Sequence, residues 1–83
     1  MTMTDALYQE VTAITEEYLG PAAERFVARQ ITFHLNKTPQ ELAVEDIPKL
    51  IEWTKVTLGL LTEDRQMIED FGNKMSRLQA AHE

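Results

Sequence analysis

Hydrophobic residues recur at helical spacing along residues 44–61, and the rest of the chain is organised around this segment. A first row on one side of the expected helix comprises Ile47, Leu50, Ile51, Thr54, Leu58 and Leu61. A second row comprises Trp53, Val56 and Leu60. A helix that is apolar over most of its circumference needs neighbours on more than one side. The segment therefore predicts a small helical bundle built around it.

Two further helices are expected before this segment, separated by a glycine-proline corner. The first covers residues 5–19, and its apolar row comprises Leu7, Val11, Ile14 and Tyr18. The second covers residues 21–36, with one row made of Ala23, Val27, Ile31 and either His34 or Leu35, and another made of Phe26 and Phe33. Gly20 can take the left-handed backbone angles that end a helix, and Pro21 is tolerated in the first turn of the next one.

Polar residues mark the two later connections. Thr38 and Glu41 have the spacing of a capping box, in which the glutamate side chain reaches back to the threonine backbone, and we expect a short helical turn over 39–42. Thr62 is the expected N-cap of a fourth helix. The apolar face of that helix comprises Met67, Ile68, Phe71, Met75 and Leu78. Gly59 lies inside the third helix, where we expect it either to allow close approach of another helix or to break the last turn.

These patterns together predict an all-α fold, a small bundle of four main helices with a short helical turn between the second and third. We expect residues 1–83 to form a single helical domain in which residues 1–3 and 80–83 are frayed. Domains of this size bury only about 60% of the surface that their unfolded chains expose, so their stability is small. Oligomerisation is a common way to add to it.

Charge and composition narrow the classes of partner. The formal net charge is −6, which disfavours binding to nucleic acid and to anionic membrane surfaces. The chain has no cysteine, so disulfides and thiolate metal sites are excluded. It shows no apolar run of transmembrane length and no signal-peptide pattern at residues 1–10. We therefore expect a soluble, cytoplasmic protein.

A search for reactive groups finds little that could support catalysis. The only two histidines are His34, on a partly apolar helix face, and His82, next to the last residue. Neither has an identifiable second catalytic group, and no metal-ligand spacing or phosphate-binding glycine loop is present. The free amides after Gly20, close to Arg25, could hold an anion, but every helix start offers such amides. We expect no enzymatic activity, catalytic residue, cofactor or bound metal.

The second row of the third helix is the main candidate for function. If the first row fills the core, then Trp53, Val56 and Leu60 need either a neighbouring helix or another molecule, and exposed apolar rows usually mark a partner. Arg25 and Arg29 lie one turn apart and favour an acidic partner, within the chain or outside it. These five residues are the predicted interaction residues of a noncatalytic interaction or regulatory module, expected to form a homodimer or to bind a protein partner.

Two other functions fit the same pattern. The chain could be an acidic helical chaperone or anti-factor that masks a basic or apolar client helix, since its size and charge suit that role. It could also be a small-ligand sensor with a pocket between helices, lined by Phe26, His34 and Trp53.

Residues 18–23, with the sequence Tyr-Leu-Gly-Pro-Ala-Ala, are followed by Phe26-Val27 and later by the acidic segment around Ile47-Pro48. This pattern resembles a short helical module that is appended to bacterial signalling proteins such as serine/threonine kinases and nucleotide cyclases. The resemblance covers most of residues 15–72, and Leu-Gly-Pro-x-Ala is its distinctive part. It implies a noncatalytic regulatory or interaction domain in signalling and carries over no catalytic residue.

Overall fold

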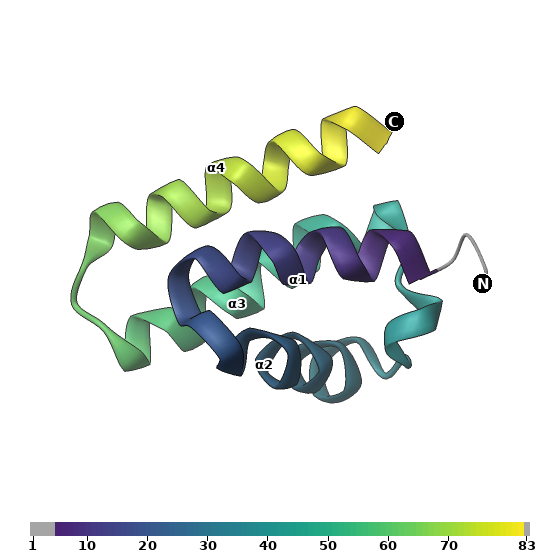
Figure 1. Ribbon diagram of the computed structural model, residues 1–83, viewed down its shortest axis with the longest axis horizontal. Coiled ribbons are helices and arrows are strands. Elements are labelled where there is room, and N and C mark those ends of the chain that lie inside the picture. The colour runs from purple at the N-terminus through teal and green to yellow at the C-terminus, as the bar shows by residue number, and fades with distance from the viewer. Residues whose placement is uncertain (1–4, 83) are drawn as a thin grey trace.

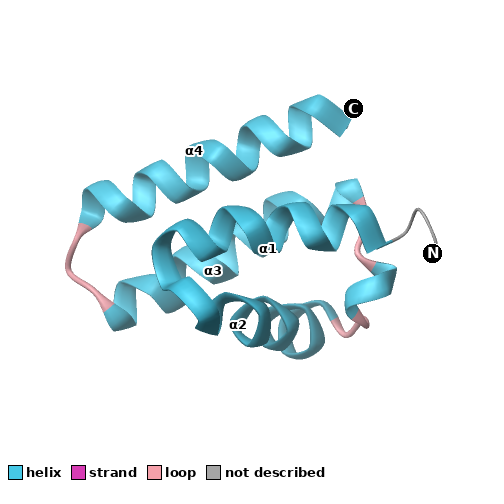
Figure 2. Cartoon of the chain, viewed as in Figure 1, coloured by secondary structure: helices cyan, strands magenta, loops and turns pink. Residues whose placement is uncertain are grey.

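The computed structural model describes residues 5–82, and their secondary structure is entirely helical, with no strand among them (Figures 1 and 2). The elements in chain order are α1 (Asp5–Leu19), a 3₁₀ turn (Gly20–Ala22), α2 (Ala23–Gln30), a π-helical segment (Ile31–Leu35), two further 3₁₀ turns (Pro39–Glu41 and Val44–Asp46), α3 (Ile47–Leu61) and α4 (Arg65–His82). The all-α class predicted from the sequence is therefore confirmed.

The predicted number of four main helices is not confirmed. Three long α-helices are present in the described part of the chain: α1 and α3 with 15 residues each, and α4 with 18. The expected helix over 21–36 is a composite, in which α2 has only eight residues between a 3₁₀ turn and the π-helical segment. The wide final turn is closed by the N–H of Asn36, which donates to the carbonyl of Ile31. Asn36 has a left-handed backbone (φ 55°), which ends the helix.

The helices are arranged with α1 and α3 in the middle, α4 on one side and α2 on the other (Figure 1). α1 packs against both α2 and α4, and α3 packs against α4 and the π-helical segment. The core between them is formed by Leu7, Val11, Ala23, Val27, Ile31, Leu42, Ile47, Leu50, Leu58, Phe71 and Met75. The apolar rows predicted for the four segments supply ten of these eleven side chains, and Leu42 comes from the short turn.

Two details of α3 differ from the sequence-based expectation. Leu61 was placed in the buried row but is 65% exposed, because α3 ends at this residue and the chain leaves for α4. Gly59 was expected to allow a close helix approach or to break the helix. Neither holds, since α3 continues to Leu61 and a Cβ added at Gly59 would have no neighbour within 4 Å. The close approach occurs instead at buried Gly72 of α4, where a Cβ would lie 3.3 Å from Cδ of Lys55.

The start of α4 also differs from the prediction. The helix begins at Arg65, and its N-cap is Asp64 rather than Thr62. The Asp64 carboxylate accepts a hydrogen bond from the Met67 N–H (3.1 Å), and its carbonyl accepts one from the Ile68 N–H (3.3 Å). The Thr62 hydroxyl accepts a hydrogen bond from the Asp64 N–H (3.1 Å), so it fixes the loop that presents the cap.

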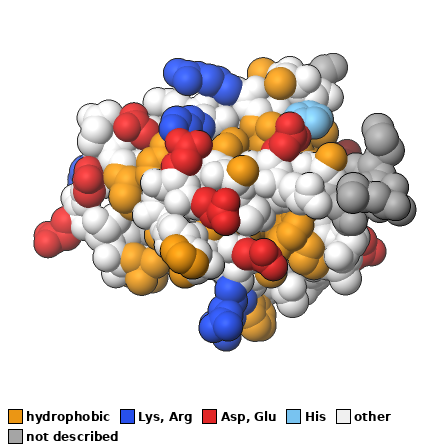
Figure 3. All heavy atoms as spheres, viewed as in Figure 1, with side chains coloured by type: hydrophobic (Ala, Val, Ile, Leu, Met, Phe, Trp, Pro, Cys, Tyr) orange, Lys and Arg blue, Asp and Glu red, His pale blue; other side chains and the backbone are white. Residues whose placement is uncertain are grey.

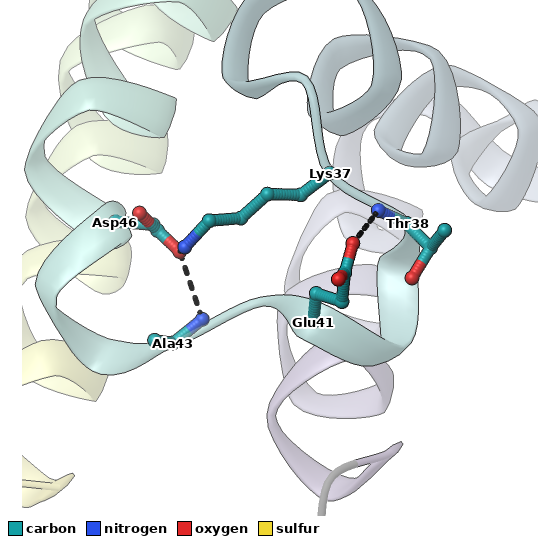
Figure 4. Close-up of polar contacts among 5 residues, drawn as sticks. All are labelled: Lys37, Thr38, Glu41, Ala43 and Asp46. Carbon is teal, nitrogen blue, oxygen red and sulfur yellow. Dashed lines mark hydrogen bonds and ion pairs between the residues drawn. The ribbon is translucent and has the colours of Figure 1, made fainter.

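The connection from the π-helical segment to α3 is built from two similar acidic turns (Figure 4). In the first, the Glu41 carboxylate accepts a hydrogen bond from the Thr38 N–H at 2.8 Å, as the capping box predicts. In the second, the Asp46 carboxylate accepts one from the Ala43 N–H at 3.0 Å. Asp46 also forms an ion pair with Lys37 at 2.7 Å, which joins the two ends of the connection.

The fraying predicted at the chain ends concerns residues that are only partly described. Residues 1–3 and Glu83 lie outside the described residues. Residues 80–82 belong to the last turn of α4, where His82 Nε2 lies 2.6 Å from Glu10 Oε2 of α1. Within residues 5–82, none of the helices combines the length and apolar character required to cross a bilayer.

Candidate functional site

One face of α3 carries hydrophobic side chains that the rest of the described chain leaves open to solvent. Trp53 is 39% exposed, Val56 56% and Leu60 82%. Together with Lys49 they follow the i, i+4, i+7, i+11 spacing of a single helical stripe, and we call this stripe the α3 outer face. The opposite side of the helix supplies four buried residues to the core, Ile47, Leu50, Thr54 and Leu58. One helix therefore has both a buried face and an exposed apolar face.

Trp53 is held in a defined position on this face. Its ring stacks on that of His34, with ring centroids 4.1 Å apart and planes at 7° to each other. His34 comes from the π-helical segment, so the widened turn places the imidazole over α3. Stacked aromatic pairs contribute about 0.5–1.5 kcal/mol beyond the area that they bury. The indole is thus ordered before any partner arrives, which lowers the entropy cost of binding.

Two adjoining hollows lie beside the outer face, where α3 meets the first turns of α4. One has a volume of about 290 Å³ and is lined by Lys55, Val56, Arg65, Ile68 and Glu69. The other has about 330 Å³ and is lined by Gly59, Thr62, Glu63, Arg65 and Ile68. They share Arg65 and Ile68, and the open space beside Gly59 belongs to the second. The surface at Val56 and Gly59 is therefore recessed and can receive a side chain of a partner.

The charges near these hollows are mixed. Lys55 forms an ion pair with Glu69 at 3.6 Å across α3 and α4. Glu63 and Arg65 stand at the turn between the two helices, and Lys49 and Glu52 are exposed on α3 itself. Elsewhere the surface is more acidic: Figure 3 shows acidic side chains spread between hydrophobic ones on the face that has α1 in front. The net charge of the chain is therefore not concentrated around the α3 outer face.

Phe33, next to His34, is a further exposed aromatic residue, with 71% of its surface accessible. Phe26 packs against the core instead. Of the second row predicted for residues 21–36, Phe26 therefore lies against the core and Phe33 lies at the surface. The π-helical turn explains this, because a wider turn changes the angular position of every residue that follows it.

Arg25 and Arg29 do not join this face. Both are exposed on α2, and neither has an ion-pair partner among residues 5–82. Glu17, in the last turn of α1, forms an ion pair with Lys74 of α4 and not with an arginine of α2. The hydrogen bond to Glu17 raises the pKa of Lys74 above its ordinary value of 10.5. Sequence reasoning missed this pair because its partners are 57 residues apart.

Arg25 borders a separate hollow of about 610 Å³ between α1 and α2, which is also lined by Tyr8 and Glu24. The Tyr8 hydroxyl donates a hydrogen bond to the backbone carbonyl of Glu24 (3.3 Å), and burial raises the pKa of this phenol above 10.0. Glu24 lies in the first turn of α2, so its charge opposes an anion at the helix N-terminus. The geometry gives no support to the anion site considered near Gly20.

Each histidine has a structural contact. His34 lies flat against Trp53, and the separation of 4.1 Å leaves no room for a ligand between the rings. His82 contacts Glu10 at the end of α4. No group of three or more histidine, aspartate or glutamate side chains within residues 5–82 is placed to hold a metal ion. The arrangement that remains is an ordered apolar surface with polar groups at its ends.

No family model matches this chain, and no curated protein or solved structure was found to match it either. The resemblance of residues 15–72 to a helical module of bacterial signalling proteins stays a prediction.

Proposed function

We propose that this protein is a noncatalytic interaction or regulatory module that binds a protein surface through the α3 outer face. The observation that carries the proposal is the exposure of Trp53, Val56 and Leu60 on one side of a helix whose other side is in the core. Contiguous apolar surface of this kind is typical of protein-binding sites. No reaction, cofactor or metal is part of the proposal.

The mechanism is burial of an ordered apolar stripe. Burying apolar surface yields about 25 cal/mol per Å², and tryptophan is among the residues that most often dominate binding. The stack on His34 presents the indole in one orientation, and Leu60 extends the contact by almost two helical turns. Arg25 and Arg29, which are unpaired within the described chain, are the groups that we propose to orient an acidic neighbour on the α2 side.

The cytoplasm is the compartment that we propose for this module, and signalling is its context. The support is the cysteine-free composition and the resemblance of residues 15–72 described above.

Two adjacent leucines allow a matched test. Leu60 lies on the outer face and Leu61 does not, although both are exposed at the end of α3. The variants Leu60→Ala and Leu61→Ala are compared with the parent chain for self-association by sedimentation equilibrium and for proteins retained from a cell extract. Circular dichroism confirms that both variants are folded.

The proposal predicts that Leu60→Ala weakens self-association, or the retention of a particular protein, at least roughly tenfold, because the most exposed apolar side chain of the interface is lost. Leu61→Ala is expected to behave like the parent. Equal behaviour of the three chains in both assays contradicts a binding role for the α3 outer face.

A further inference from the structure

We draw no further inference here: the strongest candidate, the apolar surface patch of Trp53, Val56 and Leu60 on the α3 outer face, carries nothing beyond the proposed function, because nothing in the structure shows whether a second copy or another protein covers it.

Discussion

Trp53 and His34 form the contact on which the candidate surface depends at the scale of single residues. The parallel stack at 4.1 Å explains why a tryptophan can be 39% exposed and still have a fixed orientation. The sequence predicted Trp53 as an interaction residue and, in an alternative, placed both Trp53 and His34 in a ligand pocket, but it did not predict that their rings stack. The stack could not be predicted, because it depends on the π-helical turn that rotates His34 towards α3.

Removal of the imidazole tests this contact. His34→Ala is expected to lower the free energy of unfolding by about 1 kcal/mol and to shift the emission of Trp53 to longer wavelength, because the indole loses its stacking partner and gains solvent. Urea unfolding and tryptophan fluorescence measure the two effects. His82→Ala, which removes the other histidine at the far end of α4, is the control and should leave the emission unchanged.

Alkaline pH tests Lys37, Lys74 and the partly buried phenol of Tyr8. Hydrogen bonds to Asp46 and Glu17 raise the pKa values of Lys37 and Lys74 above 10.5, and burial raises the pKa of Tyr8 above 10.0. The folded chain therefore holds more protons than the unfolded chain in this range. Stability from these groups is complete below about pH 10 and is lost as the pH rises through the raised pKa values.

We therefore expect the free energy of unfolding to fall from about pH 10 upwards. Lys37→Met, Lys74→Met and Tyr8→Phe should each make this fall shallower, and Lys49→Met, at a lysine without an ion pair within residues 5–82, should not. Denaturant unfolding at a series of pH values measures the slopes. A fall of equal steepness in all four variants and the parent would show that these contacts do not set the alkaline behaviour.

The boundaries of the elements were predicted well where they depend on residue types that are close together in the sequence. The bounds of α1, the left-handed Gly20 (φ 63°) and the Glu41 contact to Thr38 all follow from residue types at fixed spacing. The composite second helix and the cap of α4 were missed. A π-helical turn has no residue signature, and Thr62 and Asp64 are both good N-cap residues, so only the path of the loop decides between them.

The cap assignment gives a prediction at this scale. Asp64→Ala is expected to lower the free energy of unfolding by about 1 kcal/mol, since the Met67 N–H loses its acceptor. Thr62→Ala should lower the free energy of unfolding by less, because the Thr62 hydroxyl contacts only the Asp64 N–H in the loop. Thermal unfolding of the two variants measures the difference, and a larger loss for Thr62→Ala would contradict the assignment.

The glycines of α3 and α4 give another matched pair. Gly59→Ala is expected to raise the free energy of unfolding by about 0.5–1 kcal/mol, because the new methyl group enters open space and the helix loses a flexible residue. Gly72→Ala should raise the free energy of unfolding by less, since its methyl group must displace the side chain of Lys55. Chemical unfolding at low protein concentration measures both. A larger gain at Gly72 would contradict the packing described here.

At the scale of the whole molecule, the class of the fold and nearly all of its core follow from apolar periodicity, as Val11, Val27, Leu50 and Phe71 illustrate. The contacts between distant segments do not. Lys74 pairs with Glu17, and Lys37 pairs with Asp46, because the three-dimensional path of the chain brings these residues together. The sequence predicted that α3 has more apolar positions than one buried side can hold, but it left open whether a neighbouring helix or another molecule covers the second row.

The single tryptophan makes the most direct measurement possible, since its fluorescence reports only on the α3 outer face. A concentration series of the parent chain is followed by molar mass and by quenching of Trp53 with a neutral quencher, with Leu60→Ala and Leu61→Ala in parallel. In the parent and in Leu61→Ala, we predict that the quenching of Trp53 decreases as the molar mass rises to that of a dimer. In Leu60→Ala, both changes are expected only at a higher protein concentration. A dimer in which Trp53 stays as open to the quencher as in the monomer would contradict the account.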